Sequence, residues 1–388
     1  MLARMDAMVE RVRSKVEASA GVLVELSHAI AADPELAYEE HRAAERCAVV
    51  LERHGLAVER GAYGLPTAFA ARAGSRGPHV VVCAEYDALP EVGHACGHNI
   101  IAASGVGAGI ALASLAAEVG LRVTVLGTPA EELGGGKVDL IRAGAFDGVD
   151  AAMMIHPAPY DLHSARGLAI EEWEVVVHGQ AAHASCDPHL GRNALDGVVA
   201  GYTAIAMLRQ HLRPWQQVHG VITDGGAAPN VVPDRAAAAY YLRAVDAADL
   251  ADLRTRVRAC LEGAATATGT TLTIRTLSNP YEPVDANPAL VAAFGRACEA
   301  IGRPFTPDPA GPDMGGSTDF GNVSQLVPAV HAELAVHSHP AASHQREFAA
   351  HCVTPAADRT MLEGAMALAL TAIAVAADPA MLQATQPS

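Results

Sequence analysis

The segment HVVVCAEYD (residues 79–87) decides the fold of this 388-residue chain, because it is a short β-rich run that opens an alternation of strands and helices. An Ala/Gly-rich, helix-like segment follows at 99–118, and LRVTVLGTP (121–129) is again strand-like. GGKVDLIRAGAF (135–146) then predicts a short helix, and VDAAMMIHP (149–157) predicts a third strand. This order predicts an α/β fold whose largely parallel sheet is covered by helices on both faces.

The pattern changes at AIEEWEVVVHG (169–179), which alternates apolar and polar residues as a half-solvated antiparallel strand does. From here the sequence predicts strand, helix, strand, strand, helix, strand, which is the ferredoxin-like order. We therefore expect residues 168–280 to form a smaller α+β domain inserted into the first. Residues 1–167 and 281–388 would then form the two parts of the larger domain.

Composition limits the possible partners. The formal charge of −16 and the absence of a Lys/Arg-rich run argue against nucleic acid and anionic membranes, so we expect a small-molecule partner. Seven scattered cysteines indicate reduced thiols, and the charged N-terminus shows no signal peptide, so we expect a cytoplasmic location. The apolar segments 100–117 and 366–377 suit buried helices better than membrane spans.

Polar side chains follow each strand of the predicted parallel sheet. Asp87 ends the first strand, Glu131 and Glu132 follow the second, and His156 follows the third. Open α/β sheets bind their ligands at the carboxyl ends of their strands, so this edge is the expected site.

The loop GHACGHN (93–99) brings Cys96 and His98 to the same edge. A thiolate, imidazoles and carboxylates suit Zn²⁺ or a neighbouring first-row metal, although an isolated cysteine is more often a small buried hydrophobe. Adjacent carboxylates at Glu131 and Glu132 suggest that one binds metal and the other handles a proton, unless both are solvated acids at a helix start. His156 alone could equally be structural.

Eight motifs together resemble the amidohydrolase branch of the ArgE/DapE/aminoacylase metallopeptidase family. Within it, the chain is most similar to the p-aminobenzoyl-glutamate hydrolase and β-alanyl-dipeptide hydrolase subgroup. The motifs are EYDALP, GHACGHN, GTPAEELGGGK, MMIHP, GQAAHAS, GGAAPNVVPDRA, GSTDFGNVS and SHQREF.

The resemblance implies two divalent metal ions, with Zn²⁺ expected and Mn²⁺ or Co²⁺ as alternatives. The HxxxF spacing from His344 to Phe348 selects His344 over His337 and His339. The implied metal ligands are Cys96 bridging both ions, His98 and His156 on one ion, and Glu132 and His344 on the other.

The same resemblance implies roles for other residues. Glu131 would be the general base and acid, and Asp87 would orient a metal ligand beside it. His183 would reach the active site of a partner subunit and stabilise the oxyanion, which implies a homodimer whose inserted domain serves as lid and dimerisation domain. Asn230 and Arg243 match positions that hold the substrate carboxylate, although Arg243 could also be a salt-bridged strand residue.

The sequence departs from the wider family at two places. Glu85 stands where the family usually has a histidine ligand, and Cys96 with His98 replaces it. Asn99 stands where the branch often has Asp, which leaves open whether position 99 touches substrate; the role of His94 is also open.

These residues predict metal-assisted hydrolysis of an amide bond in a small N-acyl amino acid or dipeptide-like substrate. The alternatives are an aryl-amine deaminase on the same site, a cysteine hydrolase using Cys96, and a non-catalytic binding protein on a retained hydrolase scaffold. GVGAGI (105–110) lacks the context of a dinucleotide fingerprint, and close helix packing explains its glycines.

Overall fold

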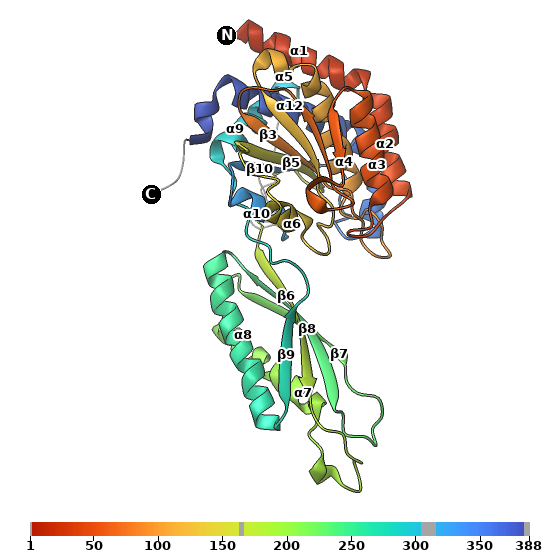
Figure 1. Ribbon diagram of the computed structural model, residues 1–388, viewed down its shortest axis with the longest axis vertical. Coiled ribbons are helices and arrows are strands. Elements are labelled where there is room, and N and C mark those ends of the chain that lie inside the picture. Colours follow the sequence, from red (N-terminus) through yellow and green to blue (C-terminus); the bar gives the residue numbers. More distant parts are fainter. Residues whose placement is uncertain (1, 163–166, 304–315, 384–388) are drawn as a thin grey trace. The chain divides into compact units, whose positions relative to one another are not determined.

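The chain divides into two compact units in the computed structural model (Figure 1). The first unit comprises residues 1–166 and 284–388, and the second comprises residues 167–283. The described residues are 2–162, 167–303 and 316–383. The Gly/Pro/Asp-rich segment 307–322, which the sequence predicts as a loop, therefore lies mostly outside the described residues.

A mixed six-stranded sheet forms the centre of the first unit, with the strand order β1-β2-β4-β3-β5-β10. Neighbouring strands among β4, β3, β5 and β10 are parallel, which confirms the predicted sheet, whereas β1 and β2 add an antiparallel edge that the sequence did not predict. The strands are β1 (Ala57–Arg60), β2 (Phe69–Ala73), β3 (His79–Ala84), β4 (Arg122–Gly127), β5 (Ala151–Ala158) and β10 (Ala329–Ala335).

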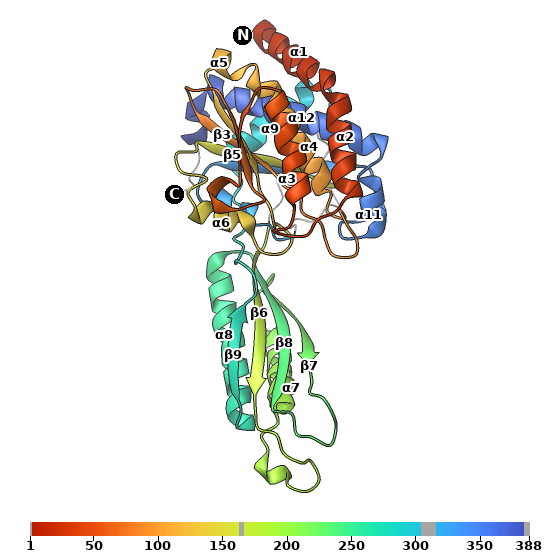
Figure 2. The ribbon, with the colours of Figure 1, turned by 45° about the vertical axis from the view of Figure 1, so that its right-hand side comes forward.

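Helices cover both faces of this sheet because alternate residues of each strand point to opposite sides. Val80 and Val82 belong to one apolar cluster, and Val81 and Cys83 belong to the other. Figure 2 shows α2, α3 and α4 on the opposite side of β3 and β5 from α6. The helices of this unit are α1 (Leu2–Ala18), α2 (Ala20–Ala32), α3 (His41–Arg53), α4 (His98–Ala113), α5 (Ala116–Val119), α6 (Gly136–Arg142), α9 (Pro288–Ala300), α10 (Phe320–Ser324), α11 (Arg346–His351) and α12 (Pro355–Ala377), with short 3-10 helices at Ala62–Gly64 and Pro379–Gln383.

The two apolar segments of the sequence are buried helices, as predicted. In α4, every residue from His98 to Leu112 is buried. A Cβ atom at Gly107 would lie 2.8 Å from the Cβ of Ala365, and one at Gly109 would lie 2.4 Å from Cγ2 of Val125, so close packing requires these glycines. Helix α12 is long and apolar enough to cross a membrane by length and composition, but 72% of its most apolar window is buried.

The second unit has the predicted ferredoxin-like order of elements. Its four-stranded antiparallel sheet has the order β7-β8-β6-β9, and α7 and α8 contribute to the same apolar cluster as the sheet. The elements are β6 (Ala169–His178), α7 (Ala194–Leu208), β7 (Gln217–Asp224), β8 (Arg235–Ala244), α8 (Ala247–Thr268) and β9 (Thr271–Thr276), with 3-10 helices at Pro188–Leu190 and Arg209–His211.

Candidate metal centre

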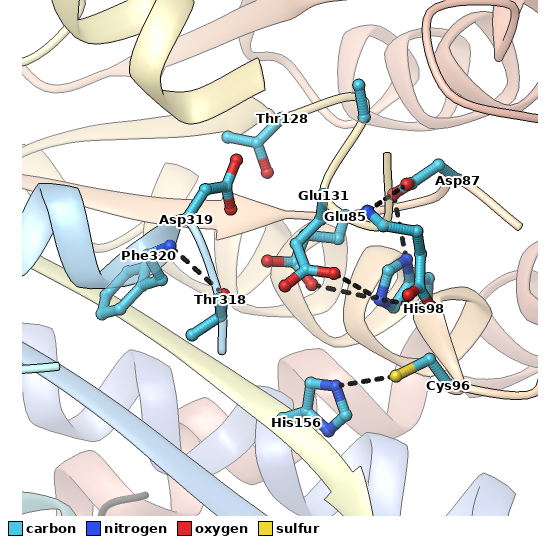
Figure 3. A network of polar contacts seen from close by, with 12 residues as sticks. Glu85, Asp87, Cys96, His98, Thr128, Glu131, His156, Thr318, Asp319 and Phe320 are labelled. Carbon is cyan, nitrogen blue, oxygen red and sulfur yellow. Dashed lines mark hydrogen bonds and ion pairs between the residues drawn. The ribbon is translucent and has the colours of Figure 1, made fainter. Parts of the chain in front are cut away.

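The carboxyl ends of β3, β4 and β5 carry a cluster of buried polar side chains (Figure 3). Asp87 follows β3, and Glu131 lies in the loop between β4 and α6. His156 belongs to the last part of β5, and His98 is the first residue of α4. The structure therefore brings together the residues that the sequence placed separately at this edge.

The loop before α4 turns tightly at Gly97, whose φ of 76° is in the left-handed region. A Cβ atom there would lie 2.3 Å from Cγ of Pro157 and 3.1 Å from Sγ of Cys352, so the position has no room for a side chain. Glycine thus lets Cys96 and His98 face the same centre.

Asp87 fixes the tautomer of His98. Nδ1 of His98 donates to Oδ1 of Asp87 at 3.0 Å, so the ring in its neutral form, which a metal ligand must have, carries its lone pair on Nε2. This Nε2 atom is buried and has no hydrogen-bond partner in the described part of the chain. Oδ2 of Asp87 also accepts the backbone N–H of Glu132 at 2.8 Å, so one carboxylate orients two of the expected ligands.

His156 is held in the corresponding way. Its Nδ1 donates to the carbonyl oxygen of Pro157 at 2.8 Å, and its Nε2 lies 3.5 Å from Sγ of Cys96. Burial, with a contribution from His331, lowers the pKa of His156 to about 3. The ring is therefore neutral and presents a lone pair to Cys96, as a metal ligand must.

His344 reaches the same cysteine from a loop 248 residues farther along the chain. Its backbone N–H donates to the carbonyl of Ala95 at 2.8 Å, which ties its loop to the cysteine loop. Nε2 of His344 lies 3.6 Å from Sγ of Cys96 and 3.7 Å from Oε2 of Glu132. His337 and His339 belong to none of the ligand groups that the described residues form.

Three groups of side chains have donor atoms within 4.8 Å of one another. They are Cys96 with His98 and His156, Cys96 with Glu132 and His344, and His98 with Glu131 and Glu132. Because Cys96 belongs to two groups, its thiolate can contact two ions. Sulfur, imidazole and carboxylate donors together fit Zn²⁺ and its first-row neighbours.

Burial and neighbouring carboxylates govern the protonation of Glu131 and Glu132. Burial, followed by Glu85 and Glu132, raises the pKa of Glu131 well above its usual value. Burial raises the pKa of Glu132 to about 7 despite His98. A bound cation would oppose both shifts by favouring the charged form.

Lys137 lies in a buried ion-pair network beside this cluster that the sequence did not predict. Its Nζ is 2.6 Å from Oε1 of Glu85 and 2.5 Å from Oδ1 of Asp319, and all three side chains are fully buried. The backbone N–H of Lys137 also donates to Oδ2 of Asp319 at 2.8 Å. Although burial opposes it, the two carboxylates raise the pKa of Lys137 well above its usual value, so the ammonium stays charged.

All three residues of this network stand in motifs that carry the family resemblance, namely EYDALP, GTPAEELGGGK and GSTDFGNVS. Their pairing depends on contacts across 182 residues, which no local pattern shows.

The cluster has an excess of negative charge that suits divalent cations. Its buried carboxyl groups far outnumber the ammonium of Lys137, and burying a charge without compensation is costly. The carboxyl groups are Glu85, Asp87, Glu131, Glu132 and Asp319. Together with the Nε2 atoms of His98 and His156, this excess makes the residues fit two divalent ions.

The structure shows the surroundings of Asn99 and His94, whose roles the sequence left open. Nδ2 of Asn99 donates to Oγ of Ser27 and to the carbonyl of Cys352, at 2.8 and 3.0 Å, so the buried amide joins α4 to α2 and the end of α11. His94 is 4% exposed and belongs to none of the ligand groups found in the described residues.

The remaining expected residues lie in the second unit. Nδ1 of exposed His183 accepts the backbone N–H groups of Ser185 and Cys186 at 3.3 and 3.2 Å, so the proton of the neutral ring is on Nε2. Asn230 is exposed, and its backbone carbonyl accepts the backbone N–H of Ala184. Arg243 is half-buried in β8, and burial lowers its pKa despite Glu172.

Comparison with known sequences identifies relatives over most of the chain. A family model described as peptidase family M20/M25/M40 matches residues 81–371. The chain is 39% identical to Xaa-Arg dipeptidase from Mus musculus, over 98% of this chain and 92% of that protein. It is 37% identical to one of the subunits of p-aminobenzoyl-glutamate hydrolase from Escherichia coli, over 62% of this chain and 55% of that protein.

Solved structures share the fold. A Bacillus subtilis protein described as a dinuclear metal binding peptidase from the M20 family superposes with a TM-score of 0.72 at 20% identity, covering 93% of this chain and 99% of that chain. An aminobenzoyl-glutamate utilization protein from Klebsiella pneumoniae gives a TM-score of 0.69 at 20% identity, covering 89% of this chain and 96% of that chain.

Proposed function

Because the chain belongs to peptidase family M20/M25/M40, we propose that it is a two-metal hydrolase that cleaves the amide bond of a dipeptide-like substrate. Membership confirms the family resemblance and the assignment as a hydrolase. The observation that carries the proposal is the pair of ligand groups that share Cys96. The substrate class is supported by the relatives named Xaa-Arg dipeptidase, which align over nearly the whole chain.

Five side chains would hold the ions. Two bound divalent ions would polarise the scissile carbonyl and lower the pKa of a water molecule. Asp87 keeps His98 in the required tautomer and positions the backbone of Glu132, so it acts through the ligands. The proposed ligands are Cys96, His98, His156, Glu132 and His344.

Glu131 is the proposed general base and acid. Its Oε2 lies 3.8 Å from Nε2 of His98, so the carboxylate borders the ligand cluster from the side of the Lys137 network. It would take a proton from the attacking water as the new C–O bond forms. It would then give that proton to the amine nitrogen as the C–N bond breaks.

The second unit of a partner subunit would offer a donor for the developing negative charge. With Nδ1 of His183 accepting two backbone N–H groups, Nε2–H is available to donate to an oxyanion. Asn230 and Arg243 are the proposed partners of the substrate carboxylate, because an amide and a guanidinium both donate to carboxylates.

We also propose that the protein is a homodimer formed through the second unit. Among the described strands, β7 pairs with β8 along one edge only, and Val221 and Ile222 on it are 59% and 39% exposed. Met207 of α7 is 63% exposed. A long apolar edge strand is a template for pairing with another strand, so a second copy of this unit is a suitable partner.

A cysteine hydrolase is disfavoured by the surroundings of Cys96. Burial and then Glu132 raise the pKa of this thiol well above its usual value, so the thiolate needs a bound cation in order to form near neutral pH. A chelator would therefore abolish hydrolysis by the proposed enzyme and spare a cysteine enzyme.

Metal analysis combined with a substrate panel tests the proposal. We expect about two equivalents of divalent metal per chain, and hydrolysis of dipeptides ending in arginine that is lost on chelation and restored by Zn²⁺, Mn²⁺ or Co²⁺. The panel would include p-aminobenzoyl-glutamate, N-acetyl amino acids and an aryl amine. Ammonia release from the aryl amine without amide cleavage would favour the deaminase, and metal binding without any turnover would favour a binding protein.

A further inference from the structure

Glu333 places a buried carboxylate oxygen next to the ligand cluster. The residue lies near the end of β10 and is in register with His156 of the parallel neighbour β5. Its Oε2 atom is buried and forms no hydrogen bond within the described residues. Burial raises the pKa of Glu333 to about 7, and no cation of the described chain offsets the shift.

The side chain of Glu333 is on the same face of the sheet as the candidate centre. Along β10, Val330, Ala332 and Leu334 pack into one apolar cluster, so His331 and Glu333 point to the opposite face. The ring of His331 stacks on that of His156 at 5.7 Å between centroids, which places both on that face. Glu333 therefore lies beside His156, one strand away, toward the carboxyl end of the sheet.

Among the described residues, the nearby cations are already paired. Lys137 is shared between Glu85 and Asp319. Arg303, which donates to the carbonyl of Ala335 on β10, pairs with Asp161 at 2.7 Å and with Glu363 at 2.5 Å. An isolated buried carboxylate is expensive to maintain, and it becomes favourable when a ligand brings the missing cation.

We infer that Glu333 receives the positively charged side chain of the substrate, so that the enzyme selects dipeptides with an arginine or lysine residue. The inference rests on the proposed function. Neighbouring strands are about 4.8 Å apart, so a long basic side chain on a peptide held at the ligand cluster can reach the next strand. A guanidinium can bind both oxygens of one carboxylate, which favours arginine.

The test uses Ala-Arg and Ala-citrulline, which have nearly the same shape but differ in charge. For the metal-loaded wild type we expect kcat/KM to favour Ala-Arg. In Glu333→Gln, kcat/KM for Ala-Arg should fall about 100-fold, as loss of a charged hydrogen-bonded pair implies, and that for Ala-citrulline should change less than about 3-fold. The matched control is Glu299→Gln, which removes an exposed carboxylate of α9 and should change neither value.

Binding to the Glu131→Gln variant, measured by calorimetry with and without Glu333→Gln, decides the inference independently of turnover. Loss of the preference for Ala-Arg supports it even if no amide is hydrolysed, in which case only the proposed function fails. Equal losses for both peptides, an unchanged preference, or no binding of either peptide would overturn it. If Glu333→Gln does not fold, Glu333→Met, which removes the buried polar group, takes its place.

Discussion

The two sheets of this protein hold charged residues in opposite ways. Strands β3 and β5 of the six-stranded sheet are buried on both faces, and their ionisable site residues Glu85, Asp87 and His156 are at or just beyond the carboxyl ends. In the four-stranded sheet, Glu172 and Glu174 of β6 are half-exposed and alternate with the buried residues Trp173 and Val175.

The difference shows in which sheet a charged residue indicates a ligand or another compensating partner. In a sheet covered on both faces, every ionised side chain must be compensated by an ion pair, a hydrogen bond or a ligand. In a sheet covered on one face, alternate residues meet water, so a charge there costs little. We therefore expect charge removal to be severe at the end of the first sheet and mild on the open face of the second.

The largest effect is expected for Glu131→Gln. Loss of the general base should lower kcat by about 10²–10⁴-fold, because the attacking water then loses the carboxylate that takes its proton. Metal content and the unfolding midpoint should stay at wild-type values, since the amide keeps the size of the side chain. Wild-type turnover in this variant would remove Glu131 from the mechanism.

The next largest effect is expected for Lys137→Met. Leaving Glu85 and Asp319 buried without their cation should destabilise the first unit by about 3–5 kcal/mol. Both tryptophans, Trp173 and Trp215, lie in the second unit, so their fluorescence follows that unit alone. Amide hydrogen exchange in β3 and β4 measures the stability of the first unit.

The exchange rates of β3 and β4 should rise while the fluorescence midpoint stays the same. Lys137→Arg is the control, because it keeps the charge. A loss of less than about 1 kcal/mol in Lys137→Met, typical of surface pairs, would contradict the comparison between the two sheets.

Metal removal should destabilise the first unit by less than Lys137→Met does. At a free metal concentration about 100 times the dissociation constant, binding stabilises the folded state by about 2.7 kcal/mol. Chelation should therefore speed exchange around Cys96 and His98 and leave the tryptophan signal unchanged. In Cys96→Ala, added metal should give no such protection; full protection in that variant would show that the thiolate is not a ligand.

The smallest effect is expected for Arg275→Met on the open face of the second sheet. Arg275 is 64% exposed at its side chain and pairs with Glu174 of β6. Such exposed pairs contribute about 0–1 kcal/mol, and salt screens them. A larger change in the fluorescence midpoint would mean that this face is covered by another surface.

Most strands and the longer helices after residue 79 could be predicted because apolar runs and the alternation of apolar and polar residues are local properties, whereas the short helices α10 and α11 lie where the sequence predicts loops. The antiparallel strands β1 and β2 could not be predicted, since β1 is short and largely exposed. For the site, the residues at strand ends were found from the placement of ligands in α/β sheets, and the choice of His344 came from the family motif.

The sequence by itself determined most of the strands and helices after residue 79, and which residue types stand at the strand ends, because both depend on neighbours along the chain. Only the tertiary structure decided that Cys96 meets His344, that Lys137 joins Glu85 to Asp319, and that Oε2 of Glu333 is buried beside His156. Cys96 and His344 are 248 residues apart, Lys137 and Asp319 are 182 residues apart, and Glu333 lies on the strand next to His156, so these contacts depend on the order in which the strands pair. Hydrophobic periodicity carries no record of that order.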